Sequence, residues 1–254
     1  MADQKLFPEG MQPLGESRFT FSCFPGIQCF TNCCKNVDMI LYPYDIIRLK
    51  NVLGIESSVF LQKYARVVHG DNPHFPTVML QVNVDSDRAC PFLSPGGCAV
   101  YHDRPSACRM YPLERAVDRR PDKRGVKEYY FLAKHPYCLG HQEENSYTVR
   151  EWIRDQRLHE YNVMNELWTE IDTMFSGNPW QGEGPAGSRQ QLAFMTCYDI
   201  DRFRKMVEEK KMVEQFVIPK ESRKNIAVND VELMKFGFEW LKFFLTGRSS
   251  LMKR

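Results

Sequence analysis

Nine cysteines are the residues of this sequence whose type and spacing could do chemistry. Eight of them form two groups along the chain, which are Cys23, Cys29, Cys33 and Cys34, then Cys90, Cys98, Cys108 and Cys138. Thiolates are soft ligands that select zinc, copper(I) or iron–sulfur clusters over magnesium and calcium. Four of them complete one tetrahedral zinc site or one cubane cluster. We therefore expect all eight to be metal ligands. Cys197 stands apart, at the expected start of a helix, and we expect it to be a small buried hydrophobic residue.

Two alternatives to metal binding remain for these cysteines: they could form disulfides, or they could be buried thiols without a chemical role. The first residues, MADQKLFPEGMQPLGESRF, lack the apolar stretch of a secretory signal, and no segment is long and apolar enough for a membrane span. We therefore expect a soluble cytoplasmic protein, in which thiols stay reduced and clustered cysteines more often bind metal than form disulfides. A thioredoxin-like C-x2-C pair is absent.

Composition places the chain among ordinary globular proteins. It has 254 residues, of which 43% are hydrophobic, so a core can form without disulfide staples. The net charge of +2 argues against a nucleic-acid-binding surface. The basic stretch at 118–124 contains acids and reads as a solvated turn.

The cysteines must be positioned by an α+β region, expected at 17–145. Alternation of apolar residues predicts short strands at 18–23 and 77–84. Pro43 and Gly54 mark the start and end of one helix, and Ser57 is the expected cap of the next.

Spacing alone brings the second group of cysteines together. Two strand-like runs, PLERAV and VKEYYFLA, flank a turn sequence centred on Lys123, which is also the midpoint between Cys108 and Cys138. A hairpin folded there returns Cys138 beside Cys108. The tight turn SPGG at 94–97 does the same for Cys90 and Cys98.

A mainly helical region is expected at 146–254. Thr148 and Glu151 form a capping box for a long helix whose apolar positions continue to Phe175. A Gly/Pro-rich linker follows at 176–190. Asp199 caps another helix, and Asn229 or Asp230 caps the last. The apolar stripes of these helices read as core packing.

Charged and aromatic residues near the cysteines allow two interpretations each. Arg104 and Arg109 flank Cys108 and could offset thiolate charge. For Arg104 we favour an ion pair with Asp103 or another acid over a role at the thiolates. For Arg109, a role at the thiolates and a hydrogen bond to a backbone carbonyl are equally supported. His102, His135 and His141 read as ordinary histidines rather than ligands, because eight thiols are available.

One apparent nucleotide motif is excluded by its context. GEGPAG at 182–187 satisfies G-x-G-x-x-G but follows a helix and a linker rather than a strand. We therefore expect no nucleotide site there, and no other Gly-rich phosphate or adenosine loop appears.

The cysteine-containing segments resemble a known family. CFTNCC at 29–34, LYPYDIIRLKNVLGI at 41–55 and CPFLSPGGCAVYHDRPSACRMYPL at 90–113 are similar to the YkgJ family, which carries the CxxCxxCC zinc- or iron-chelating domain. The resemblance covers roughly residues 17–140 and implies a bound metal centre. The gaps around Cys23 and Cys29 depart from the family's C-x2-C-x2-C-C, so Cys23 is the least supported ligand. A relative, the flagellin lysine N-methylase, implies that some members modify proteins.

Three functions follow as hypotheses. The first is a cytoplasmic protein with an iron–sulfur cluster, [4Fe–4S] by preference, used in electron transfer or a cluster-supported reaction. The second is a Zn²⁺-stapled module that binds a protein partner through its C-terminal helices. The third, a protein lysine N-methyltransferase, rests on the family resemblance alone. No catalytic residue is identified, and neither nucleic acid, membrane nor nucleotide is expected as a partner.

Overall fold

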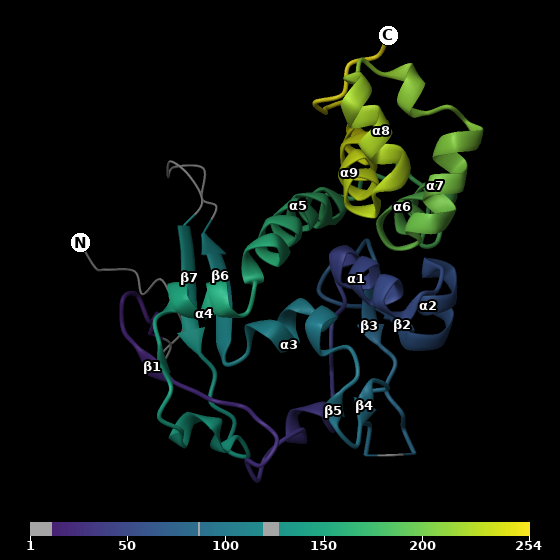
Figure 1. Ribbon diagram of the computed structural model, residues 1–254. Helices are drawn as coiled ribbons and strands as arrows, with labels where there is room; N and C mark the ends of the chain where they lie inside the picture. Colours follow the sequence, from purple (N-terminus) through teal and green to yellow (C-terminus); the bar gives the residue numbers. More distant parts are fainter. Residues whose placement is uncertain (1–11, 86, 119–126) are drawn as a thin grey trace.

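The computed structural model describes residues 12–85, 87–118 and 127–254. The fold is α+β, as predicted, with short antiparallel strand pairs before residue 148 and helices after it (Figure 1). The strands are β1 Phe19–Thr20, β2 Ala65–Val68, β3 Thr77–Leu80, β4 Leu93–Ser94, β5 Gly97–Cys98, β6 Leu113–Asp118, β7 Lys127–Leu132 and β8 Ser146–Tyr147. The α-helices are α1 Pro43–Leu53, α2 Ser57–Tyr64, α3 Ser106–Met110, α4 Val149–Asp155, α5 Leu158–Ser176, α6 Ser188–Tyr198, α7 Ile200–Glu209, α8 Lys220–Val228 and α9 Asp230–Thr246.

The helix boundaries expected for α1 are confirmed. Pro43 is its first residue, and Gly54 ends it with a φ of 65°, a conformation that glycine adopts without strain. The next helix, α2, also forms, but Ser57 is not its cap. The cap position belongs to Glu56, and the Ser57 hydroxyl donates instead to Asp199 at 2.7 Å.

The strands of the first half are shorter than the alternating sequence suggests. The run 77–84 is a strand only as far as Leu80, where pairing with β2 ends, and Val84 is 72% exposed. Of the run 18–23, only β1 pairs, with β8 from beyond residue 145. Alternation therefore located the buried side chains of Val78, Leu80 and Val82, but it failed for Val84 and for the extent of backbone pairing.

The hairpin between Cys108 and Cys138 forms in the predicted place. Its strands β6 and β7 pair antiparallel from Leu113 opposite Leu132 to Asp118 opposite Lys127. The turn at 119–126, which includes Lys123, lies outside the described residues.

The long helix expected from Thr148 to Phe175 is wrong in one respect, because it is two helices. The capping box of Thr148 and Glu151 starts α4 as predicted. The helix ends at Asp155, and Arg157 has a positive φ of 52°, after which α5 begins. The break frees the Gln156 carbonyl, which accepts a hydrogen bond from the Arg109 guanidinium at 2.7 Å. The hydrogen bond from Arg109 thus replaces a hydrogen bond that the Gln156 carbonyl would accept within a continuous helix.

The remaining helices follow most of the capping signals. Asp199 caps α7 and Asn229 caps α9, both through hydrogen bonds to backbone N–H groups. The expected linker is shorter than 176–190, since α6 begins at Ser188, and residues 182–187 form turns. Cys197 is buried as predicted, but it lies near the end of α6 rather than at a helix entry.

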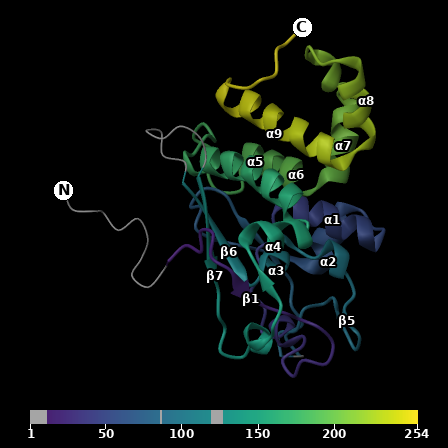
Figure 2. The ribbon, with the colours of Figure 1, turned by 60° about the vertical axis from the view of Figure 1, so that its left-hand side comes forward.

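Two hydrophobic clusters fill the fold. The larger one joins α1, α2 and β3 to α5, α6, α7 and α9, so it draws on both sides of the predicted boundary at residue 145. The smaller one lies between β1, the β6–β7 hairpin and α4, around Trp152. Helix α5 belongs to the larger cluster, and Figures 1 and 2 show it next to α9.

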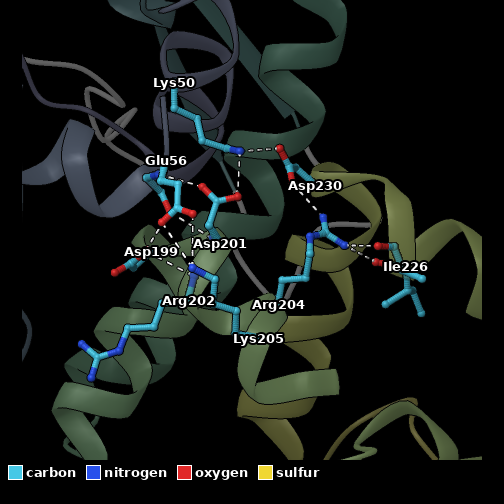
Figure 3. Close-up of polar contacts among 11 residues, drawn as sticks. Lys50, Glu56, Asp199, Asp201, Arg202, Arg204, Lys205, Ile226 and Asp230 are labelled. Carbon is cyan, nitrogen blue, oxygen red and sulfur yellow. Dashed lines mark hydrogen bonds and ion pairs between the residues drawn. The ribbon is translucent and has the colours of Figure 1, made fainter. Parts of the chain in front are cut away.

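Buried charges also connect the two parts of the chain (Figure 3). The Lys50 ammonium of α1 contacts Asp201 of α7 at 3.0 Å and Asp230 of α9 at 2.9 Å. Arg204 shares Asp230 at 2.7 Å. The Lys50 side chain is 7% exposed, so these ion pairs are screened little by water.

Within the described residues, no helix has both the length and the apolar character that crossing a membrane requires.

Candidate metal centre

The eight predicted ligands lie in loops and short turns, and all nine cysteines are free thiols. Segment 23–34, the β4–β5 hairpin and segment 138–142 gather at the end of the molecule opposite α9 in both ribbon views (Figures 1 and 2). Only Cys197 lies apart, inside the large hydrophobic cluster.

Backbone hydrogen bonds bring Cys34, Cys90 and Cys98 together from three loops. The N–H of Cys90 donates to the carbonyl of Cys34 at 2.8 Å. The tight turn predicted at 94–97 closes the β4–β5 hairpin, in which Leu93 pairs with Cys98. The expected approach of Cys90 and Cys98 therefore occurs, and Cys34 joins them.

A second set of contacts brings the start of the chain to the end of the β6–β7 hairpin. The N–H of Leu139 donates to the sulfur of Cys29 at 3.2 Å. The N–H of Ser22 donates to the carbonyl of Gly140 at 3.0 Å. This packing needs a glycine, because a Cβ at Gly140 would lie 2.6 Å from the Ser22 oxygen. Cys23 and Cys29 are thereby held next to Cys138.

The adjacent pair Cys33 and Cys34 lies on a 3₁₀ turn, Asn32–Cys34. The Cys34 thiol donates a hydrogen bond to Cys33, and this bond is the main cause that lowers the pKa of Cys33 to about 7. The same bond raises the pKa of Cys34 far above its usual value. Of the two thiols, Cys33 is therefore the one that ionises more readily.

The other thiols suppress one another's ionisation. Burial, followed by the charges of Cys33, Cys29 and Cys138, raises the pKa of Cys23 to about 11. Cys108 keeps some solvent exposure, but the surrounding protein and then Cys90, Cys33 and Cys98 raise its pKa to about 12. Thiols this close repel as thiolates, and a bound cation removes that repulsion.

Hydrogen-bond donors are already placed at several sulfur atoms. Burial raises the pKa of Cys90, but the backbone N–H groups of Phe92 and Leu93 favour its thiolate. The N–H of Val100 does the same for Cys98. Donors of this kind orient thiolate ligands and disperse their charge. They fit the binding of a soft cation.

Arg104 contributes charge to the cysteines, whereas Arg109 holds the backbone. Asp103, the partner expected for Arg104, pairs with Arg48 instead. The buried Arg104 guanidinium lies over the Tyr101 ring at 3.9 Å, and its positive charge lowers the pKa of both Cys23 and Cys98 against the effect of their burial.

The guanidinium of Arg109 donates to the carbonyls of His102 and Gln156 at 2.5 Å and 2.7 Å. The carbonyl-anchoring interpretation of this residue is therefore correct.

Aromatic rings cover the Cys138 side of the site. His135 is stacked between Tyr111 at 5.5 Å and Tyr137 at 5.2 Å between ring centroids. The Tyr111 hydroxyl hydrogen-bonds to Cys138, and its pKa is raised chiefly by burial, so it stays protonated. The third histidine near the cysteines, His141, packs edge-on against Phe21.

Asp45 is a residue that positions the cysteine-bearing helix α3 and that the sequence analysis did not identify. Its buried carboxylate accepts the N–H of Tyr42 at 3.0 Å at the start of α1. It also accepts the N–H of Ser106 at 2.8 Å at the start of α3, which carries Cys108. Burial raises its pKa to about 6. An acidic residue at the third position of a helix predicts a hydrogen bond to the backbone at the helix start. The contact of Asp45 with Ser106, 61 residues away, cannot be predicted from any local sequence pattern.

Across the described residues, no group of three or more His, Cys, Asp or Glu side chains is arranged closely enough around one point to hold a metal ion. The fit to a metal therefore rests on the thiol donor set, its proximity and the groups that stabilise thiolates.

Comparison with known proteins gives one match. Residues 22–139, just under half of the chain, match the family model CxxCxxCC, described as "Putative zinc- or iron-chelating domain". The match contains all eight predicted ligands and confirms the resemblance, since the YkgJ family is the same family. No curated protein and no solved structure matches the chain, so the similarity to flagellin lysine N-methylase stays a prediction. Residues 22–139 of this chain are thus similar to the CxxCxxCC family of zinc- or iron-chelating domains.

Proposed function

We propose that this chain is an iron–sulfur protein of a reducing compartment, with a [4Fe–4S] cluster used in electron transfer or a cluster-supported reaction. The observation that carries the proposal is that segments with free thiols, far apart in the sequence, are hydrogen-bonded to one another, Cys90 to Cys34 and Leu139 to Cys29. When bound, such a cluster supplies a one-electron redox couple. The chain's own residues would hold it through cysteine thiolates.

Several residues support a redox role over a purely structural one. N–H donors to Cys90, Cys98 and Cys29 and the positive charge of Arg104 stabilise negative charge on sulfur. Both kinds of interaction raise the reduction potential of a thiolate-bound cluster. The rings of Tyr111 and His135 lie beside Cys138 and reduce its contact with water.

A zinc-stapled module is the second candidate. The observation that favours it is that thiols lie on small turns and hairpins, namely the 3₁₀ turn Asn32–Cys34 and the β4–β5 hairpin, as in structural zinc sites. In this case the metal would contribute folding free energy, and the helices after residue 148 would be the surface for a protein partner.

Metal and sulfide analysis of the full chain, purified without oxygen, separates the two candidates. The iron–sulfur proposal expects brown protein containing iron and acid-labile sulfide, with a visible absorption that bleaches on reduction. Colourless protein with stoichiometric zinc would establish the second candidate in its place. Protein that retains neither metal under these conditions would contradict both.

A further inference from the structure

We propose that a groove between α7 and α8 binds an acidic, amphipathic segment of a partner protein. The groove has a volume of about 470 Å³, and Leu233 of α9 lies at its base. In both ribbon views α8 and α9 lie at the end of the molecule opposite the cysteine segments (Figures 1 and 2). A partner held in the groove would leave the cysteines uncovered, so the proposal holds whichever metal they bind.

Contacts among three helices build the groove. Both α7 and α8 pack on α9. Arg204 of α7 donates to the carbonyls of Ile226 and Ala227 at the end of α8, at 3.0 Å for Ile226, and it pairs with Asp230 at the start of α9 (Figure 3). The groove is therefore part of the packed helical fold rather than of a loose loop.

The floor of the groove is apolar. Val207 of α7, Ile226 of α8 and Leu233 of α9 are buried side chains of the larger hydrophobic cluster, and all three line the groove. Ala227 adds a small exposed side chain beside them. Apolar side chains of a ligand would gain free energy by leaving water for this floor.

Positive charge surrounds this floor. Four cationic side chains of the rim have either no ion pair or a weak one among the described residues: Lys211, Lys220, Arg223 and Lys224. The weak pair joins Lys224 to Glu221 at 3.9 Å, and it contributes little because both side chains are exposed. Two acids, Glu208 and Glu214, also line the groove. The cations outnumber these acids, so the rim complements a ligand with negative charge.

Arg223 supplies a hydrogen-bond donor that the fold leaves unused. Its side chain is partly buried, and its Nε atom is buried without a hydrogen-bond partner among the described residues. A buried donor without an acceptor is costly, and a guanidinium can bind a carboxylate through two parallel N–H groups. A carboxylate that enters the groove would therefore meet a donor that is already in place.

The shape of the groove favours a protein segment over a small molecule. The groove is partly open to solvent, whereas small ligands are usually enclosed over most of their surface. An amphipathic helix covers an open apolar groove with one face and keeps its other face in water. Glu208 and Glu214 would repel the phosphates of a nucleic acid, which makes that ligand a poorer fit.

Peptide selection on the full chain tests the proposal without a known partner. A helix with apolar anchors at i, i+3, i+4 and i+7 needs about two to three turns, so a displayed library of random peptides about 12 residues long contains such segments. We expect the selected peptides to combine Asp or Glu with Leu, Ile, Met or Phe at this spacing.

Affinity measurements on the selected peptides locate the binding site. Fluorescence anisotropy should show that Arg223→Glu weakens binding roughly tenfold to a hundredfold, because the variant reverses the charge that faces the peptide. Ala227→Trp should weaken binding as well, since the larger side chain fills the groove. Arg150→Glu, at an exposed position of α4, is the matched control and should leave the affinity unchanged.

A second charge variant guards against misfolding at the partly buried Arg223. Lys220 is exposed, so Lys220→Glu leaves the packing intact and should also weaken binding. Thermal unfolding followed by circular dichroism shows which variants keep the fold of the unaltered chain.

A library that yields no binding peptide, or only peptides without acidic residues, would overturn the proposal. Acidic peptides that keep their affinity for a folded charge variant or for Ala227→Trp would overturn it too, because they bind elsewhere. A single-stranded oligonucleotide that displaces every selected peptide at a lower concentration than unlabelled peptide would assign the groove to nucleic acid instead. None of these outcomes depends on the iron or zinc content, which the metal analysis measures separately.

Discussion

Arg104 illustrates what a single side chain contributes to the thiol region. It is buried at 9% exposure, although no acid was found to pair with it among the described residues. Its guanidinium donates to the Tyr101 carbonyl at 2.6 Å and to the Gln156 side chain. A buried cation without a carboxylate partner is costly, and Cys98 and Cys108 would supply compensating charge when a bound metal holds them as thiolates.

Replacement of this arginine is therefore expected to weaken metal binding. Arg104→Met keeps much of the side-chain volume but removes the charge, and it should lower zinc affinity roughly tenfold to a hundredfold, the usual effect of losing a group that supports the ligands. Competition with a chromophoric chelator measures this affinity. Arg202→Met, on the exposed surface of α7, is the control. Unchanged affinity in Arg104→Met would show that its charge does not act on the thiols.

Glu239 gives a pH-dependent prediction at the same scale. Partial burial favours its neutral form, but Lys242 at 2.8 Å and the N–H of Ser250 at 2.8 Å lower its pKa from 4.5 to about 2. Because this pKa lies below the unfolded value, its contribution to stability is complete above pH 4.5 and is lost as the pH falls towards 2. Glu239→Gln should cost about 1–2 kcal/mol at pH 7.

Urea unfolding of the chain and of Glu239→Gln at pH 7, 4 and 2.5 measures this difference. We expect it to shrink as the pH is lowered. A difference that stays constant across this range would mean that the carboxylate charge is not the cause.

At the scale of elements, the sequence predicted where helices start better than where they end. Proline, capping-box and Asn/Asp signals located α1, α4, α7 and α9, because these signals act within one turn. The break at Arg157 and the role of Asp45 were not predictable, since both depend on contacts with α3, roughly 50 to 60 residues away in sequence. Helix-capping hydrogen bonds can thus be predicted from the sequence, whereas hydrogen bonds between residues far apart in the sequence cannot.

The same contrast holds for the candidate site. Residue type identified the candidate thiols, and the turn sequence at 94–97 correctly predicted that Cys90 and Cys98 lie close together. The contacts of Cys34 with Cys90 and of Cys29 with Leu139 depend on how segment 23–34 lies across the others. Nothing in the spacing of the cysteines specifies that path.

Gly140 offers a test of the contact between β1 and segment 138–142. Gly140→Ala places a methyl group 2.7 Å from the Phe21 ring as well as against the Ser22 oxygen. We expect it to destabilise the fold by about 1–3 kcal/mol, as overpacking commonly does. Thermal unfolding measures the loss.

Gly96→Ala is the matched control for this substitution, because nothing lies within 4 Å of a Cβ at Gly96. Equal melting temperatures for the two variants would contradict the close packing at Gly140.

At the scale of the whole molecule, the cysteine-containing part and the helical part share one interior. Leu41, Leu49 and Phe60 from the first part pack in the same cluster as Phe203 and Leu241 from the second. The Lys50 network joins the same elements through charge (Figure 3). We therefore expect the two parts to unfold together.

Lys50→Met tests this coupling. It removes the Lys50 cation from Asp201 and leaves Asp230 paired with Arg204 alone, and removing one partner from such a group costs roughly 3–5 kcal/mol. The control is Lys205→Met, whose pair with Glu56 is more than half exposed and should cost less than about 1 kcal/mol. Circular dichroism and Trp fluorescence should report one shifted transition in Lys50→Met. Separate transitions for helices and thiol region would contradict a shared interior.

The shared cluster also constrains how the chain matures on the ribosome. Leu49 of α1 belongs to the same hydrophobic cluster as Leu241 and Leu245 of α9, and the two helices are in contact. Nearly two hundred residues must be synthesised between these partners, and the nascent α1 keeps an uncovered apolar surface for that time. The eight predicted ligands, by contrast, have all been synthesised by residue 138, long before α9. The thiols can therefore bind a metal before α9 packs into the hydrophobic cluster. A bound metal would then hold the segments around α1 together while α9 is still being synthesised.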